Sequence, residues 1–490
     1  MTKPTTTFSG PEICQLPARE VVNLLKNKKV SPKELLDASY ERIAQVEPAI
    51  NATVTQCPKR AYASLENLEA HAKKHGSHEA WLGGLPIAIK DLTVVSGVTT
   101  TFGSYGLRDF VLEENDPLVD RLEDRGGVVV GKTNTPEFGA GGNTFNQVFG
   151  YTRNPWDTRK NAGGSSGGAA ASLATGEVWL SHGSDLAGSL RTPAAYCGVC
   201  GFRATPGRAG GGPGPAAFLM EGISGPMARD VEDTALFLDA MTGFDPRMPL
   251  SLEAPAVSFQ EVLKQEKKNI RIAFNPDQNG FSPVEANIRH VMAAAMALLD
   301  SNGLRVEEAC PELPDLYETY VSLRGTHYGS INAFAPDSVR EHFKQTLQDN
   351  ISTGQAQTSH DIYLAMRGRT DLYQRMRVFL EDYDVLAIPV VGLEPEVVEN
   401  EYPEYVDGQK TTDYVDWLRF SFLATTTALP ALALPIGFTQ NGMPVGIQLI
   451  GPPRGEAVVL QVGLAIERGL NLGAGPIDPK TTGTRSRPAT

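Results

Sequence analysis

The chain has 490 residues, of which 41% are apolar and 21% are charged, and its formal net charge is −13. This composition is that of a globular protein, with a length that suits one large domain or two to three average ones. The negative charge disfavours nucleic acid and anionic membranes as partners, because binding to phosphate groups requires a basic surface.

The first residues are polar and contain no apolar stretch of the signal-peptide kind. The longest apolar run, residues 423–438, contains two prolines and is too short to span a bilayer. Five scattered cysteines form no disulfide framework and suit a reducing compartment. We therefore expect a cytoplasmic protein that does not bind membranes.

The predicted elements alternate between helices and strands. Residues 17–47 predict two helices, the second of which starts with Ser31 as N-cap and Pro32 as its first residue. Short apolar runs predict buried strands at 85–89 and 128–130, with Lys90 at the end of the first. No strand is expected at 150–168. Later elements are a helix that starts at 169–173, strands at 178–180, 270–274, 384–390, 431–435 and 445–450, and helices at 284–301, 361–380 and 456–468. This alternation predicts a layered α/β fold.

Three segments carry side chains suited to nucleophilic catalysis. They are Leu85-Pro-Ile-Ala-Ile-Lys90, Gly163-Gly-Ser-Ser-Gly-Gly168 and Asp185-Leu-Ala-Gly-Ser189. A serine hydroxyl is a poor nucleophile at neutral pH and needs a base. A lysine can supply that base once desolvation lowers its pKa. Taken alone, each serine could be a turn residue, and Lys90 could be a strand-end lysine paired with Asp91.

In this order and with these flanks, the three segments resemble the Ser-Ser-Lys signature of the amidase signature family. Four further segments are similar to the family's sequences: Pro17–Leu25, Asn154–Asp157, Ser224–Arg229 and Gly442–Pro452. The resemblance covers roughly residues 15–240 and 380–468 and implies a single domain over 1–490 with a mixed central β-sheet sandwiched between helices. In that fold, 15–240 and 380–468 form the catalytic core, 245–380 is a variable substrate-binding insertion without a clear counterpart, and 480–490 is a loose tail.

The resemblance also implies a role for each candidate residue. Ser189 is the expected nucleophile, Ser165 the proton carrier, usually after a cis peptide bond, and Lys90 the neutral base. The expected oxyanion hole consists of the backbone N–H groups of Leu186, Ala187, Gly188 and Ser189, provided that Ala187 has a negative φ. The residues expected to support the site are Ser166 and the charged pair Asp185 and Arg191, for which a simple surface pair is the alternative.

Other motifs give weaker predictions. Cys197-Gly-Val-Cys200 has the spacing of a redox or zinc half-site, but no partner motif accompanies it, so we expect two buried structural cysteines. No metal or cofactor is implied. The glycine-rich stretch 207–218 is either a surface connection or an active-site lid, with Arg208 as a candidate contact to substrate.

The sequence argues against an α/β-hydrolase and a P-loop protein, and it leaves an amidotransferase subunit as an alternative function. Gly163-Gly-Ser165-Ser-Gly167 matches the Gly-x-Ser-x-Gly pattern of α/β-hydrolases, but a polar loop precedes it and no histidine follows His360. A P-loop is excluded because no lysine follows the glycines. A glutamine-amidotransferase subunit of the same fold, which works on charged transfer RNA with partner chains, remains an alternative.

The expected substrate is a small amide, anilide or carbamate, and the expected assembly is a monomer or homodimer. The segment spacing and the glycine-rich loop resemble most the bacterial aryl-acylamidase and urethanase members of the family. The aromatic residues Tyr317, Tyr320, Tyr328 and Phe334 favour a hydrophobic acyl or aryl group over a free carboxylate, unless they belong to the core.

Overall fold

The computed structural model describes residues 3–76, 78–211, 217–473 and 475–481. Its main strands are β1 (Thr53–Gln56), β2 (Leu85–Lys90), β3 (Gly127–Thr133), β8 (Leu180–Asp185), β9 (Cys200–Arg203), β10 (Ile223–Ala228), β11 (Arg271–Phe274), β12 (Arg305–Glu308), β13 (Val385–Pro389), β16 (Ala431–Phe438) and β17 (Pro444–Ile450). They form one mixed eleven-stranded sheet in the order β1-β3-β2-β8-β10-β9-β16-β17-β13-β11-β12.

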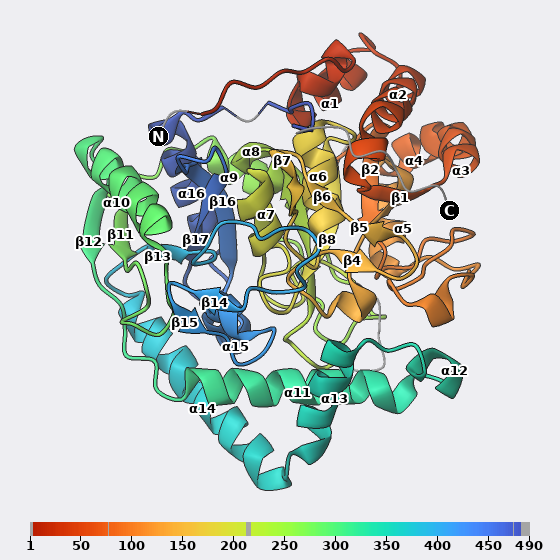
Figure 1. Ribbon diagram of the computed structural model, residues 1–490. Helices are drawn as coiled ribbons and strands as arrows, with labels where there is room; N and C mark the ends of the chain where they lie inside the picture. Colours follow the sequence, from red (N-terminus) through yellow and green to blue (C-terminus); the bar gives the residue numbers. More distant parts are fainter. Residues whose placement is uncertain (1–2, 77, 212–216, 474, 482–490) are drawn as a thin grey trace.

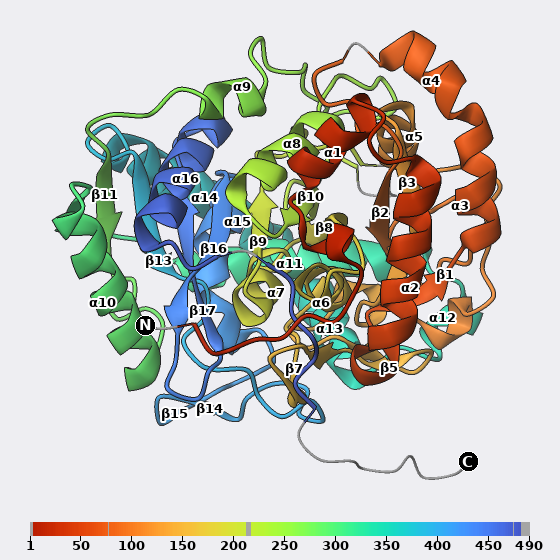
Figure 2. The ribbon, with the colours of Figure 1, turned by 90° about the horizontal axis from the view of Figure 1, so that it is seen from above.

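Helices flank this sheet, as Figures 1 and 2 show from two directions. They are α1 (Ala18–Lys26), α2 (Pro32–Ile50), α3 (Pro58–Ser64), α4 (Leu68–His75), α5 (Pro117–Asp124), α6 (Gly167–Thr175), α7 (Arg191–Cys197), α8 (Val231–Met241), α9 (Phe259–Leu263), α10 (Ala286–Ser301), α11 (Leu316–Phe334), α12 (Asp337–Arg340), α13 (Gln345–Ala356), α14 (Ser359–Phe379), α15 (Phe422–Thr427) and α16 (Glu456–Leu470). The predicted single α/β domain with a mixed central sheet is confirmed.

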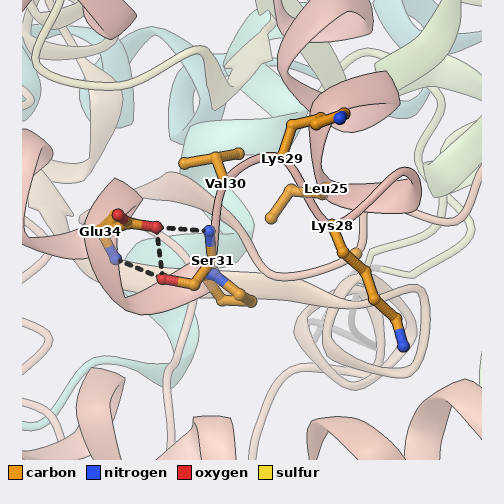
Figure 3. Close-up of a pocket in the computed structure, with 8 residues that line it drawn as sticks. Leu25, Lys28, Lys29, Val30, Ser31 and Glu34 are labelled. Carbon is orange, nitrogen blue, oxygen red and sulfur yellow. Dashed lines mark hydrogen bonds between the residues drawn. The ribbon is translucent and has the colours of Figure 1, made fainter.

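The start of α2 follows the predicted signal. Ser31 Oγ accepts a hydrogen bond from the Glu34 N–H at 3.2 Å, and the Glu34 carboxylate accepts one from the Ser31 N–H at 2.7 Å (Figure 3). Pro32 occupies the first helical position, where the absence of an N–H is harmless. This reciprocal capping satisfies two donors that a helix start otherwise leaves unpaired.

The order of strands brings the three motif segments together. Strands β2 and β8 are parallel neighbours, with Ile89 opposite His182. Their carboxyl ends, Lys90 and Asp185, therefore meet at one edge of the sheet, where functional residues of open α/β sheets collect. The loop 186–190 follows β8, and the glycine-rich segment leads into α6.

Two local predictions were wrong. Residues 150–168 contain the short strands β5 (Gly150–Tyr151), β6 (Arg153–Asn154) and β7 (Asp157–Asn161), and β4 (Phe145–Asn146) pairs with β5. These pairs lie outside the central sheet and show no apolar alternation, which is why the sequence pattern misses them. The strand expected at 178–180 instead starts at Leu180 and continues through buried polar residues to Asp185.

Part of the middle segment, residues 245–380, belongs to the central sheet. Strands β11 and β12 extend the central sheet at its edge, where β11 pairs in parallel with β13. Helices α11, α13 and α14 lie together below the sheet in Figure 1. The remaining small strands, β14 (Tyr405–Val406) and β15 (Gln409–Lys410), form a hairpin. Most of the predicted tail at 480–490 lies outside the described residues, and in the described part no helix has the length and apolarity to cross a membrane.

Candidate active site

Lys90 lies at the centre of the candidate site. Its Nζ donates hydrogen bonds to Ser165 Oγ at 2.7 Å, Ser166 Oγ at 2.8 Å and Ser184 Oγ at 3.0 Å. The side chain is fully buried. The alternative pairing with Asp91 does not occur, because Asp91 binds Lys132 Nζ at 3.0 Å instead. Lys90 therefore contacts hydroxyl groups rather than a carboxylate.

The surroundings of Lys90 favour its neutral form, which can act as a base. Burial lowers the pKa of Lys90 to about 7, against a smaller opposing effect of the Asp185 charge. A neutral amine has two N–H donors and one lone pair, so one of its three hydroxyl neighbours has to donate to it. Ser166 Oγ donates to the Ser184 carbonyl at 3.1 Å, which leaves Ser165 and Ser184 as possible donors to the lone pair.

Ser165 is placed by the glycine-rich loop. The peptide bond between Gly164 and Ser165 is cis. A Cβ on Gly164 would stand 2.6 Å from the Gly141 carbonyl oxygen, so glycine is needed there. The Ser166 N–H donates to the Ser189 carbonyl at 3.1 Å and so joins this loop to the expected nucleophile.

Ser189 lies beside this cluster and is 6% exposed. Its hydroxyl has no hydrogen-bond partner within the described residues, so the transfer of a proton from Ser189 to Ser165 stays a prediction.

The backbone N–H groups expected to form the oxyanion hole differ in their hydrogen bonds. The Gly188 N–H donates to Asp185 Oδ1 at 3.1 Å in this structure, so its role as an oxyanion donor stays a prediction. The N–H groups of Ala187 and Ser189 have no acceptor in the described chain, Ala187 avoids positive φ as the prediction required, and Leu186 stays a predicted donor.

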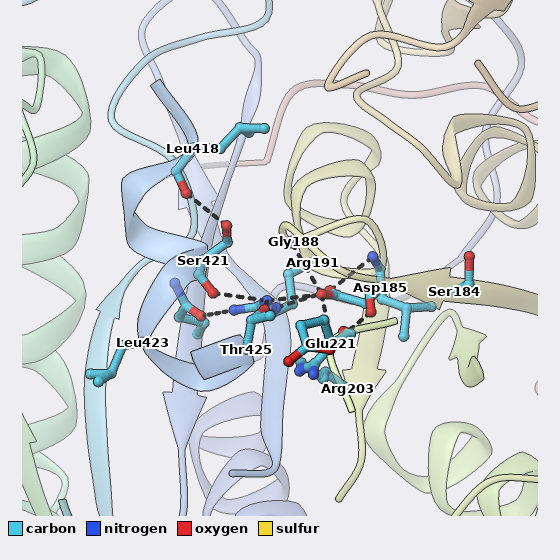
Figure 4. Close-up of polar contacts among 12 residues, drawn as sticks. Ser184, Asp185, Gly188, Arg191, Arg203, Glu221, Leu418, Ser421, Leu423 and Thr425 are labelled. Carbon is cyan, nitrogen blue, oxygen red and sulfur yellow. Dashed lines mark hydrogen bonds and ion pairs between the residues drawn. The ribbon is translucent and has the colours of Figure 1, made fainter. Parts of the chain in front are cut away.

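Asp185 organises the loop that carries Ser189. Its carboxylate accepts hydrogen bonds from Arg191 Nε at 3.0 Å and Nη2 at 2.9 Å, and from the Leu190 N–H at 3.1 Å (Figure 4). Burial by itself would raise the pKa of Asp185, but the charges of Arg191 and Arg203 hold it well below its ordinary value. All three side chains are fully buried, so the surface-pair alternative does not hold.

Sequence reasoning missed three residues of this site. Ser184 contacts Lys90, Arg203 Nη1 lies 3.3 Å from Asp185 Oδ1, and Gln448 Oε1 accepts from Arg191 Nη1 at 2.7 Å. Arg203 and Gln448 come from β9 and β17, which only the strand order brings near β8. Gln448 lay within a segment similar to the family, but nothing in the sequence connected it to Arg191.

Arg208 is placed apart from the Lys90 cluster. It donates to the Glu253 carbonyl at 2.8 Å and lies 3.6 Å from the Glu456 carboxylate, and no contact in the described residues joins it to Lys90 or Ser189. Residues 212–216 of the candidate lid lie outside the described residues.

The remaining candidates are mostly structural. Cys197 and Cys200 are buried free thiols, and burial raises the pKa of each. Within the described ranges, no group of three or more His, Cys, Asp or Glu residues could hold a metal ion. Of the middle-segment aromatic residues, Tyr320 and Tyr328 are buried, whereas Phe334 is 64% exposed.

Known proteins resemble this chain over most of its length. The amidase family model matches residues 34–460, a range that includes the middle segment. An acylamidase from Rhodococcus erythropolis is 34% identical over 461 residues, which cover 92% of this chain and 95% of that protein. A glutamyl-tRNA(Gln) amidotransferase subunit from Geobacillus stearothermophilus is 34% identical over 480 residues, with coverage of 92% and 96%.

A solved structure shows the same fold. A bacterial aryl acylamidase of the amidase signature family superimposes with a TM-score of 0.85 at 27% identity, over 93% of this chain and 96% of that one. The matching range, the relatives and the shared fold lead to one assignment: this chain belongs to the amidase signature family and is a hydrolase of amide bonds.

Proposed function

We propose that Ser189 is the nucleophile of this hydrolase, that Lys90 is the base and that Ser165 carries the proton between them. The observation that carries this proposal is the buried Lys90 amine, whose pKa lies near neutrality and whose Nζ contacts Ser165 Oγ at 2.7 Å. Such an amine is partly unprotonated at pH 7 and can accept a proton without any histidine.

The proposed cycle has two acyl-transfer steps. Neutral Lys90 takes the proton of Ser165, which takes that of Ser189 as its oxygen attacks the carbonyl carbon. The Ala187 and Ser189 N–H groups, with that of Leu186, stabilise the tetrahedral oxyanion. The proton returns through Ser165 to the leaving nitrogen as the C–N bond breaks, and water then hydrolyses the ester by the same relay.

The proposed substrate is an amide with an aryl or bulky acyl group. The relatives described as acylamidase and aryl acylamidase support this choice, as do Tyr320 and Phe422, which stack near the loop 186–190. A carbamate presents the same carbonyl carbon to Ser189, so urethanase activity is part of the proposal. We expect the enzyme to act in the cytoplasm as a monomer or homodimer.

The amidotransferase relative supports a second candidate function, in which the chain works on charged transfer RNA together with partner chains. The two functions differ in what they require. A hydrolase cleaves anilides as a purified single chain, whereas an amidotransferase component depends on partners that would co-purify with it.

A probe of the nucleophile tests the proposed function. A fluorophosphonate should label wild-type protein at Ser189, as located by mass spectrometry. Ser189→Ala should abolish labelling and lower kcat for p-nitroacetanilide by several orders of magnitude, on the order of 10³-fold or more. Ser165→Ala removes the proposed proton carrier, so labelling of Ser189 should become weak or absent while the protein stays folded. Labelling at Ser165 in place of Ser189 would contradict the assignment.

A further inference from the structure

Arg324 is a buried cation without a carboxylate partner. It lies on α11, is 3% exposed and makes no ion pair with any acid of the described residues. Its Nε donates to Asn350 Oδ1 at 2.7 Å, its Nη1 to the Tyr320 hydroxyl at 3.2 Å, and its Nη2 to the Tyr414 hydroxyl. A guanidinium has five N–H donors, so two of them have no acceptor in the described chain.

The aromatic neighbours do not cancel this charge. The guanidinium lies 4.7 Å from the ring centroid of Tyr328 and 5.2 Å from that of Tyr414. Burial raises the pKa of Tyr320 to about 12 and that of Tyr414 well above its ordinary value, so both hydroxyls stay neutral. Neutral rings attract a cation, but they do not neutralise it.

The other mostly buried cations nearby already have carboxylate partners. Lys344 Nζ binds Glu401 at 2.6 Å, and Arg369 Nη2 binds Glu221 at 2.6 Å. A third acid, the buried Glu137, accepts hydrogen bonds from the Lys344 N–H and the Ser104 hydroxyl, both at 2.8 Å, and does not contact Arg324. Arg324 is therefore a buried cation whose hydrogen-bond partners in the described chain are all neutral groups. Buried charges in proteins are normally paired, which makes this one a candidate for pairing with a ligand.

Contacts lead from Arg324 to the oxyanion loop. Tyr320 stacks on Phe422 with ring centroids 3.7 Å apart. The preceding residue, Ser421, has its Cβ 3.0 Å from where a Cβ on Gly188 would stand. Only two residues therefore separate Tyr320 from the backbone that surrounds Ser189.

A second path leads from Arg324 to the proton carrier. Lys344 faces the Tyr414 ring at 5.9 Å, and its neighbour Phe343 packs edge-on against Phe138 at 5.3 Å. A Cβ on the next residue, Gly139, would stand 3.4 Å from Ser165 Oγ. Contacts through intervening residues thus connect the surroundings of Arg324 with Gly188 on one path and with Ser165 on the other.

His327, one turn farther along α11, adds another polar group without a partner. Its buried Nδ1 has no hydrogen-bond partner within the described residues. Its ring lies 3.2 Å from where a Cβ on Gly222 would stand, and Leu186 Cδ1 is 3.8 Å from the same point. His327, which shares a face of α11 with Arg324, therefore lies near the side chain of Leu186 at the start of the oxyanion loop.

We propose that Arg324 is a specificity-determining residue that binds a carboxylate carried by the substrate away from the scissile amide bond. This deepens the proposed function and rests on it: the substrate is an acyl or aryl amide with an anionic group on its acyl or amine part. A carboxylate matches the paired N–H donors of a guanidinium in geometry and charge. This departs from the sequence-based expectation, which favoured groups without a free carboxylate and did not consider Arg324.

Two matched substrate pairs test the inference. The acyl side is probed with succinyl-p-nitroanilide against butyryl-p-nitroanilide, and the amine side with N-acetyl-4-aminobenzoate against N-acetyl-4-toluidine. In at least one pair, kcat/KM of the wild-type enzyme should be roughly tenfold to a hundredfold higher for the carboxylated member. If the wild-type enzyme prefers the neutral member in both pairs, the inference is wrong, and no result with a variant can restore it.

The variants separate recognition from folding. Arg324→Gln should remove the preference while leaving kcat/KM for the neutral member within about threefold, and Arg324→Lys should keep part of it. Arg271→Gln is the control, since Arg271 lies on β11, next to the edge strand β12, with its guanidinium 5.0 Å from the Tyr383 ring. This variant should not change the preference. An equal loss for both members in folded Arg324→Gln would assign Arg324 a structural role.

Failure of the proposed function gives a different result. If Ser189 is not labelled by a fluorophosphonate and no anilide is cleaved, the catalytic assignment fails. If Ser189 is labelled and neutral anilides are cleaved without any preference for a carboxylate, only the Arg324 inference fails.

Discussion

At the scale of single residues, two buried lysines stand on neighbouring strands with different partners. Lys132 contacts the Asp91 carboxylate at 3.0 Å, whereas Lys90 contacts hydroxyl groups. Burial lowers the pKa of both, but only Lys132 has a carboxylate in contact to hold its proton. The difference makes Lys90 the lysine that can lose its proton near neutral pH.

The rate should follow the titration of Lys90. Because the neutral amine is the base, kcat/KM for p-nitroacetanilide should rise with pH through a pKa of about 7 and then level off. Arginine does not deprotonate in proteins, so Lys90→Arg should lose at least ~10³-fold in kcat while it stays folded. The exposed variant Lys33→Arg is the control. Substantial turnover by Lys90→Arg, or a profile flat between pH 5 and 9, would contradict the role of Lys90.

The three proposed catalytic residues could be located from the sequence because each lies in a short local pattern. Ser184, Arg203 and Gln448 could not, since their contacts depend on the order of strands in the sheet. Nor does any pattern indicate that Gly188 donates to Asp185, because that bond depends on how the loop 186–190 turns.

At the scale of elements, the loop 186–190 takes its shape from one carboxylate. Asp185 accepts from the backbone on both sides of Ser189, at Gly188 and Leu190, and from Arg191 at the start of α7. Arg203 of β9 approaches the same carboxylate from two strands away. The apolar pattern predicted only the start of β8, because the rest of the strand carries polar side chains in a buried position, of which Ser184 and Asp185 contact the site.

Removing the charge of Asp185 should damage both stability and activity. Asp185→Asn leaves Arg191 and Arg203 buried without compensation, so the free energy of unfolding in urea should fall by about 3–5 kcal/mol. Activity should fall as well, because the loop that carries Ser189 loses its anchor. The control is Asp157→Asn, which breaks a surface pair with the exposed Arg159 and should change stability by about 1 kcal/mol or less. Similar losses in both variants would show that Asp185 does not organise the loop.

At the scale of the whole molecule, one sheet joins segments that are far apart in the sequence. The alternation of apolar runs predicted the α/β class and most long helices, but it could not predict that β11 and β12 extend the sheet beyond β13. Nor could it show that the segments around Thr7 and Asp478 lie side by side, as they do where the Asp478 N–H donates to the Thr7 carbonyl. Such pairings between distant segments leave no local pattern in the sequence.

A buried carboxyl pair ties the N-terminal helices to the core. Glu177 is fully buried, and its carboxyl group accepts from Thr53 at 2.5 Å and from Thr175 at 3.0 Å. Burial and the like charge of Glu47 raise the pKa of Glu177 well above its ordinary value of 4.5. Glu47 in turn accepts the Ala52 and Thr53 N–H groups at 2.8 and 2.7 Å. The pair holds α2, β1 and α6 together while Glu177 keeps its proton.

This pair should make stability depend on pH. Above pH 4.5 the unfolded chain releases the Glu177 proton, whereas the folded protein keeps it to a higher pH, so stability should fall as pH rises through this window. Glu177→Gln is neutral at every pH, and its Tm should exceed that of wild type by about 1–3 °C at pH 8, with a smaller difference at pH 5, in scanning calorimetry. The control is Glu41→Gln, at an exposed site of the helix that carries Glu47, whose effect should not change with pH. If the Tm of Glu177→Gln differs from that of wild type by the same amount at pH 5 and pH 8, the carboxyl pair does not titrate in this range.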